Sequence, residues 1–164
     1  MKKTLVLFSA LLSTCACPCD ATIKEGTSIQ SQVSETEITR YAQTYLDYLK
    51  KVGETPAENM ASISSPFNAH CRKTMNGEVV AHNATEFVDQ LSGLRKACTS
   101  WTMNVLEIIP SPSTKSATLY YTIKVPPLGA FTVMKVARFD DVGKVLEINE
   151  VFSPLKEETQ GAKK

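Results

Sequence analysis

Two histidines and one acidic residue are the side chains of this sequence best suited to proton-transfer chemistry. His70 and His82 flank an Asn-Gly pair, and Glu150 lies in a strand-like segment. A general acid or base needs a titratable group that is held in a pocket with a shifted pKa. Each of the three is therefore a candidate catalytic residue, and the elements that carry them decide between chemistry and a structural role.

The histidines lie on the two arms of a predicted β-hairpin. Met75-Asn76-Gly77-Glu78 is the sequence of a type I′ turn, in which both central residues have positive φ. Counting outward from this turn places Cys71 opposite His82 and His70 one residue further out. Strand alternation then sends the two imidazoles to opposite faces. We therefore expect no joint metal site and no cofactor, and either histidine alone is a candidate base or a rim residue.

Glu150 belongs to a predicted strand over 144–152. It shares its strand face with the apolar Ile148 and Phe152, and an acid on such a face can line a pocket with a raised pKa. The alternatives are an acid at the rim of the sheet or an ion pair with Arg138 on the neighbouring strand. A cavity beside Glu150 would distinguish the catalytic role from the other two.

Cys71 and Cys98 are candidates for a disulfide or for two small buried residues. Neither has a cationic neighbour in sequence that would mark a reactive thiolate, so we expect no cysteine catalysis. Cysteine is often simply buried, whereas an oxidising compartment outside the cytoplasm permits a disulfide. Both interpretations stay open.

Residues 1–19 have the pattern of a bacterial secretory signal peptide. Met1-Lys2-Lys3 supplies positive charge, residues 4–12 supply a short apolar core, and small residues with three cysteines follow. Leu12-Ser13-Thr14-Cys15 resembles the lipobox of bacterial lipoproteins, in which the cysteine is acylated. Cys15 is therefore a candidate lipidation site, and cleavage after Ala16 is the alternative. We expect an exported protein, periplasmic or anchored in the envelope, or alternatively secreted.

The composition is that of one ordinary globular domain behind this leader. The 164 residues are 43% hydrophobic and 21% charged, with a formal net charge of +1. Basic residues are scattered among acidic ones, so we expect no nucleic-acid binding. Membrane contact is expected only through the N-terminal lipid anchor, because no run of apolar residues is long enough for a span. We place a flexible linker at 20–34, the domain at 35–155 and a polar tail at 156–164.

Helical segments come first along the domain and strands dominate its second half. Helices are predicted at about 35–52, 56–63 and 84–97, the hairpin lies between the last two, and longer strands follow at 101–109, 116–125, 130–139 and 144–152. The first helix is capped by Ser34 or Thr36, the second by a capping box at Thr55-Pro56-Ala57-Glu58, and the third by Asn83. This order predicts an α+β fold with a helical layer on an antiparallel sheet.

The order of elements resembles the nuclear transport factor 2-like superfamily, particularly its SnoaL-like branch, over about residues 34–155. The most specific segments are Met75-Asn76-Gly77-Glu78 and Asp141-Val142-Gly143-Lys144-Val145. The resemblance implies an α+β, cystatin-like roll: a cone-shaped, curved antiparallel sheet packed on three N-terminal helices, with a pocket between them. The expected pocket residues are Tyr45, Trp101, Tyr120, Arg138 and Glu150.

Fold does not fix activity in this superfamily, which includes polyketide cyclases, a ketosteroid isomerase, dehydratases, ligand binders and structural adaptors. Where SnoaL-like members often show His-Trp-Asp in the closing strand, this chain has Ile148-Asn149-Glu150. The difference favours non-catalytic binding of a small apolar ligand or a protein partner in the pocket. The first alternative is an isomerase, cyclase or dehydratase that uses Glu150, His70 or His82.

A structural dimerisation module is the second alternative. Both faces of the predicted strand 116–125 carry apolar or aromatic residues, since Tyr120 backs Leu119 and Tyr121. A sheet that covers its core needs only one such face, so the outer face is expected to form a symmetric homodimer.

Overall fold

The structure, a computed structural model, describes residues 33–155. The predicted signal peptide with Cys15, nearly all of the linker and the tail at 156–164 lie outside the described residues and stay predictions. Within the described part, no helix is long and apolar enough to cross a membrane.

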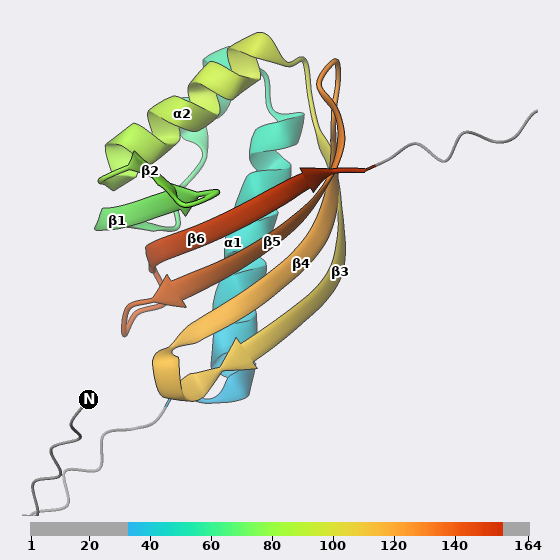
Figure 1. Cartoon of the computed structure of the whole chain (residues 1–164). Coiled ribbons are helices and arrows are strands. Elements are labelled where there is room, and N and C mark those ends of the chain that lie inside the picture. The colour runs from blue at the N-terminus through green and yellow to red at the C-terminus, as the bar shows by residue number, and fades with distance from the viewer. Residues whose placement is uncertain (1–32, 156–164) are drawn as a thin grey trace, which may run out of the picture. The chain divides into compact units, whose positions relative to one another are not determined.

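The described chain alternates helical and strand segments in the order predicted (Figure 1). The elements are α1 (Glu35–Glu54), η1 (Ala57–Ser62), β1 (Phe67–Met75), β2 (Glu78–Ala81), α2 (Ala84–Ala97), β3 (Thr102–Ser111), η2 (Pro112–Thr114), β4 (Ser116–Val125), β5 (Gly129–Phe139) and β6 (Val145–Pro154). The α+β class is confirmed. The middle of the three predicted helices is a short 3-10 helix, η1.

Local capping fixes where the two α-helices begin. Ser34 forms the capping box of α1 with Glu37, which decides between the two predicted caps. Asn83 caps α2 by accepting a hydrogen bond from the Glu86 amide at 2.9 Å. The capping box predicted at 55–58 is wrong, because no side chain caps η1. Thr55 instead ends α1, and its amide donates to the Lys51 carbonyl at 2.9 Å.

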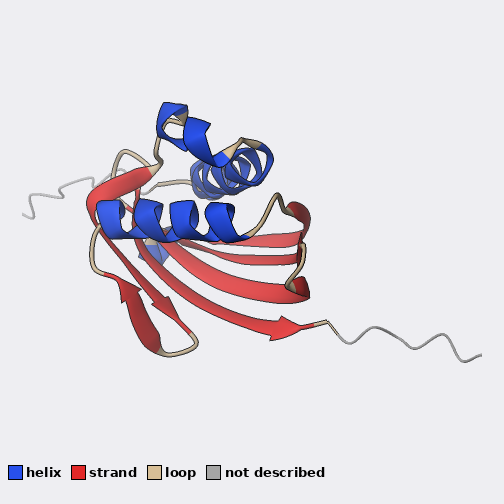
Figure 2. Ribbon diagram, turned by 90° about the horizontal axis from the view of Figure 1, so that it is seen from above, coloured by secondary structure: helices blue, strands red, loops and turns tan. Residues whose placement is uncertain are grey.

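One six-stranded sheet in the order β2-β1-β6-β5-β4-β3 forms the second layer. It curves around α1, and both α-helices lie on its concave side (Figures 1 and 2). Helix α1 packs on β3, β4 and β5, whereas α2 covers β1 and β2. The antiparallel prediction is wrong for one pair, since β1 and β6 run parallel. The chain between these two strands forms α2 and four further strands, a crossover that local sequence patterns do not reveal.

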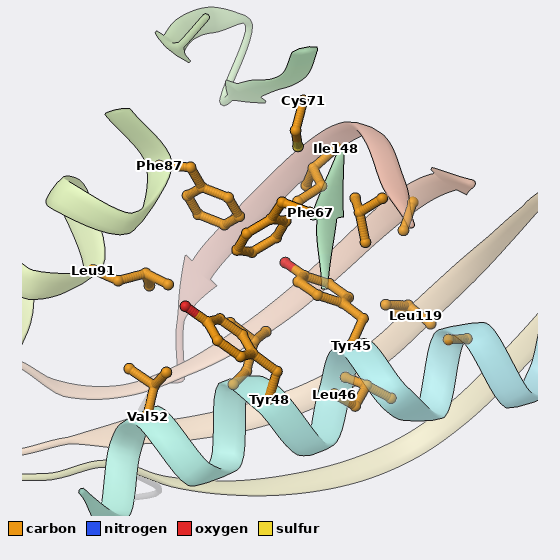
Figure 3. Close-up of a cluster of buried hydrophobic side chains, with 14 of the residues drawn as sticks. Tyr45, Leu46, Tyr48, Val52, Phe67, Cys71, Phe87, Leu91, Leu119 and Ile148 are labelled. Atoms are coloured by element: carbon orange, nitrogen blue, oxygen red, sulfur yellow. The ribbon is translucent and has the colours of Figure 1, made fainter. Parts of the chain in front are cut away.

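Aromatic side chains from the two layers interlock in the core (Figure 3). The Phe67 ring of β1 lies 4.5 Å from the Phe87 ring of α2 and 5.3 Å from the Tyr48 ring of α1, between centroids. Tyr45 and Leu119 are fully buried beside them. Because Phe67 contacts both helices, this cluster fixes α1 and α2 against the same part of the sheet.

The predicted hairpin is present with its type I′ turn, since Asn76 and Gly77 have φ of 49° and 88°. Met75 pairs with Glu78 as predicted, but a bulge follows and Lys73 pairs with Ala81. The predicted pairing of Cys71 with His82 is therefore wrong, because the bulge adds a residue to the second arm. Strand β2 ends at Ala81, before the second histidine.

Candidate functional site

A cavity of about 360 Å³ lies between helix α2 and the inner face of the sheet. Most of its wall is apolar, with polar groups from β1, α2, β4, β5 and β6. The lining residues are Leu49, Lys73, Met75, Gln90, Leu91, Leu94, Trp101, Met103, Tyr121, Ile123, Val125, Leu128, Phe131, Val133, Lys135, Glu150 and Phe152. Pockets of this size and composition hold small molecules.

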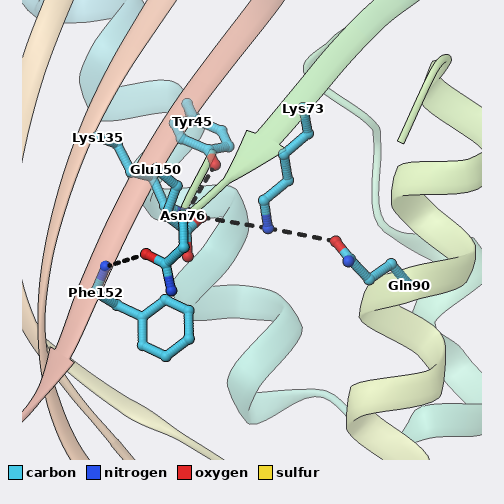
Figure 4. Close-up of polar contacts among 7 residues, drawn as sticks. All are labelled: Tyr45, Lys73, Asn76, Gln90, Lys135, Glu150 and Phe152. Carbon is cyan, nitrogen blue, oxygen red and sulfur yellow. Dashed lines mark hydrogen bonds and ion pairs between the residues drawn. The ribbon is translucent and has the colours of Figure 1, made fainter. Parts of the chain in front are cut away.

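Glu150 forms the centre of a buried ionic cluster in this wall. Its Oε2 lies 2.9 Å from Lys135 Nζ and 3.2 Å from Lys73 Nζ. Both ammonium groups are at ion-pair distance, yet neither is aligned for a hydrogen bond to Oε2, which is buried. Gln90 extends the cluster to α2, because Lys73 donates to its Oε1 at 3.3 Å (Figure 4).

Strand register brings the three charged groups together. Lys135 on β5 and Glu150 on β6 are direct partners in the antiparallel ladder, and Met75, two residues beyond Lys73, is opposite Glu150 in the parallel ladder. The hairpin turn is also tied to β6: the Asn76 amide donates to the Glu150 carbonyl at 2.8 Å, and the Phe152 amide donates to Asn76 Oδ1 at 3.2 Å. The turn therefore holds the end of β1 beside the acid.

The pKa of Glu150 is lowered, not raised as its apolar strand face suggested. Burial alone would raise it, but the ammonium groups of Lys135 and Lys73 outweigh burial and keep the carboxylate ionised. A carboxylate stabilised in this way is a weak general base. Glu150 is therefore suited to balancing charge in the pocket.

The two lysines differ in how fully neighbouring groups compensate their positive charges. Burial alone would lower the pKa of Lys135, but Glu150 and two tyrosines surround it and raise this pKa. Its ammonium donates to Tyr45 Oη at 3.2 Å. Burial and the nearby Lys135 charge lower the pKa of Lys73 to about 8. Lys73 is thus the member of the cluster whose charge changes nearest neutral pH.

Trp101 is part of the apolar lining of the cavity. Its indole N–H donates to the Leu49 carbonyl at 3.0 Å, and its ring leaves no room for a side chain at Gly53 of α1. The Arg95 guanidinium lies 5.5 Å from the ring centroid and donates to the Thr55 carbonyl at 2.8 Å. The tryptophan is therefore held in one position by both α-helices.

The histidines and cysteines take no part in this site. His70 and His82 are exposed and line none of the cavity. Cys71 and Cys98 are free and buried, which decides between the two predictions against a disulfide. Burial raises the pKa of the Cys71 thiol to about 11. Residues 33–155 contain no group of three His, Cys, Asp or Glu side chains placed to hold a metal ion.

The predicted pocket residues divide between the two faces of the sheet. Trp101 and Glu150 line the cavity, and Tyr45 lies behind it against Lys135. The prediction is wrong for Tyr120 and Arg138, because strand alternation sends both to the outer face. Arg138 there faces Glu147 across the ladder and pairs with it at 3.0 Å, so its predicted ion pair with Glu150 does not form.

Lys73, Lys135 and Gln90 are the site residues that sequence analysis missed. Lys135 interrupts a row of inward apolar residues on β5, with Val133 before it and Ala137 after it. A lysine in such a row is a detectable sign of a buried partner. Lys73 and Gln90 carry no comparable sign, because the hairpin bulge and the placement of α2 decide where they lie.

Comparison with known proteins identifies the fold. No family model matches the chain, and no curated protein matches it. A protein of unknown function with a cystatin-like fold from Methylobium petroleophilum PM1 superposes with a TM-score of 0.58 and 13% identity, over 79% of this chain and 84% of that one. The fold is cystatin-like, the fold shared by NTF2-like proteins such as the next one.

Two further solved structures support this assignment. An NTF2-like protein of unknown function from Exiguobacterium sp. 255-15 has a TM-score of 0.55 and 14% identity, over 70% of this chain and 99% of that one. A putative isomerase of the SnoaL-like family from Agrobacterium tumefaciens str. C58 has a TM-score of 0.56 and 11% identity, over 72% and 98%. At these identities the likeness shows the fold alone.

Proposed function

We propose that this protein binds a small, largely apolar ligand in the cavity under α2, without transforming it. The observation that carries this proposal is a preformed cavity of about 360 Å³ whose wall is mainly aliphatic and aromatic. The polar groups that line it are engaged with one another, as the Lys73–Glu150–Lys135 contacts show. Such a wall offers apolar contact area with a few polar groups to orient the ligand.

Acid–base catalysis of the isomerase, cyclase or dehydratase kind has less support. It requires a base of suitable pKa within reach of a substrate. His70 and His82 are exposed away from the cavity, and two lysines lower the pKa of Glu150. The isomerase name of one neighbour describes that protein, and the charges around Glu150 favour binding here.

Intrinsic fluorescence provides a direct test, because Trp101 is the only tryptophan of the chain and lines the cavity. Titration of the whole protein with decan-1-ol should give a saturable change in Trp101 emission. Leu94→Phe, which extends an aromatic ring from α2 into the cavity, should weaken binding about tenfold. Leu106→Phe on β3 is the matched control, because Leu106 is exposed and outside the cavity wall. Equal affinity in both variants would place the ligand elsewhere.

A homodimer through the outer sheet face is a second proposal, carried by a separate observation. Tyr120, Met134 and Val151 are direct neighbours across β4, β5 and β6. Met134 is 48% exposed and Val151 is 55% exposed. None of the helices within residues 33–155 covers this face (Figure 2). A continuous apolar row on such a face is typical of a protein interface.

Light scattering after gel filtration should therefore give twice the mass of one chain at micromolar concentration. Val151→Lys should give a folded monomer, because it would bury two ammonium groups in a symmetric interface. Val142→Lys, at an exposed turn position, should leave the dimer intact. A wild-type mass of one chain across the concentration range would rule out this interface.

A further inference from the structure

The charged groups of the cavity do not balance. Lys73 and Lys135 each carry an ammonium group, and Glu150 supplies the one carboxylate that contacts them. The other titratable groups near the cluster are Tyr45, Tyr121 and Cys71, and burial raises the pKa of each, so all three are neutral at pH 7. One positive charge is therefore left over beside an apolar cavity.

That excess charge resides on Lys73. Lys135 is enclosed by its carboxylate partner and by two tyrosine rings, whose centroids lie 5.4 and 5.5 Å from its Nζ. Lys73 has a longer contact with Glu150, a hydrogen bond of 3.3 Å to Gln90 and the Phe87 ring at 4.8 Å. A charge in an apolar site is costly unless it is paired, so a negative group beside Lys73 would be stabilising.

We propose that the ligand of this cavity is a monocarboxylic acid with an apolar body, whose carboxylate pairs with Lys73 while its body lies against Trp101 and the aliphatic wall. This inference rests on the proposed function, since it names the ligand class for the same cavity. A monoanion matches the single excess charge. Gln90 also lines the cavity, and its amide has two N–H donors. A medium-chain or alicyclic acid fits a cavity of about 360 Å³.

Decanoate and decan-1-ol distinguish recognition of a carboxylate from binding of an apolar chain, because the two molecules have the same apolar body and differ in the polar group. Titrations of the whole protein, followed by Trp101 emission at pH 7, should give decanoate an affinity at least about tenfold higher than that of decan-1-ol. Lys73→Met should remove this advantage, so that this variant binds decanoate no more tightly than decan-1-ol. Lys124→Met, at an exposed residue of β4 outside the cavity wall, should retain the full preference.

The preference should also depend on pH. The titratable groups facing Lys73 are Glu150, Lys135 and Cys71. Burial and the Lys135 charge lower the pKa of Lys73 to about 8, although Glu150 and Cys71 act in the opposite direction. Decanoate binding requires the ammonium form, so its affinity should fall about tenfold from pH 7 to pH 9. The affinity for decan-1-ol should stay constant over that range.

The results that would contradict the proposed function differ from those that would contradict the carboxylate inference. If neither probe changes Trp101 emission, the apolar cavity does not bind ligand and the proposed function falls. If both probes bind with equal affinity, or if Lys73→Met binds decanoate as tightly as wild type, the cavity binds apolar ligands and the carboxylate inference is overturned.

Discussion

Glu150→Gln should lower the free energy of unfolding by about 3–5 kcal/mol, the cost of removing one partner from a buried ion pair. Glu150 is the shared counter-charge of Lys73 and Lys135, and the three side chains are 5–10% exposed. The amide leaves two ammonium groups facing each other in an apolar wall. The loss should be measured by urea denaturation at pH 7, with Trp101 emission as the signal.

Glu147→Gln is a matched control on the same strand. Glu147 is also ion-paired, to Arg138 at 3.0 Å, but the two side chains are 33% and 51% exposed. Exposed pairs contribute under about 1 kcal/mol, so this variant should be nearly as stable as wild type. Equal effects of the two substitutions would contradict the central role of the buried cluster.

The destabilisation by Glu150→Gln should be smaller at pH 9 than at pH 6. The folded-state pKa of Lys73 already lies below its ordinary value, and loss of the carboxylate lowers it further. Between the folded-state and unfolded-state values the unfolded chain binds more protons, so stability rises with pH in that window. Because the pKa of Lys73 is lower in the variant, the stability of the variant begins to rise at a lower pH than that of wild type. The difference in free energy of unfolding between the two proteins therefore becomes smaller as the pH rises.

Gly53→Ala is the second substitution with a large expected effect. A Cβ at Gly53 would lie 2.4 Å from Trp101 Nε1 and 2.5 Å from Cδ1. The indole cannot retreat without breaking its hydrogen bond to the Leu49 carbonyl. Overpacking of this kind costs about 1–3 kcal/mol or more, and we expect the upper part of that range together with a shift of Trp101 emission.

Gly93→Ala makes the same chemical change in α2, where an added Cβ meets nothing within 4 Å. It should raise stability by about 0.5–1 kcal/mol, because alanine has less backbone entropy to lose on folding than glycine. Chemical denaturation of the two variants gives the change in free energy of unfolding for the same substitution at a tightly packed position and at an open one. Stabilisation in both variants would show that the Trp101 ring moves freely.

Helix caps, turns and single strands could be predicted because each depends on residues that are close together in the sequence. Asn83 as a cap and Asn76-Gly77 as a type I′ turn each need only neighbouring residues, and both are present. Strand β4 spans the predicted 116–125, because alternating apolar residues specify both its length and its buried face.

The remaining features depend on distant parts of the chain. The bulge opposite the step from Lys73 to Thr74 shifted the hairpin register and with it the expected position of His82. The parallel pairing of β1 with β6 determines that Lys73 meets Glu150, and no pattern in either strand encodes that choice. The cavity was expected only through resemblance, and its charged residues were missed because periodicity shows which side faces inward but not which residues meet there.

The parallel pairing of β1 and β6 also bears on when the fold can form. Phe67 and Val145 are partners although 78 positions separate them in sequence, and contacts of such long range make folding slow. Strand β1 and its hairpin lack their neighbour in the sheet until β6 has been synthesised. A nascent chain that remains unfolded until its closing strand emerges stays competent for passage through a secretory channel, which suits the export predicted from residues 1–19.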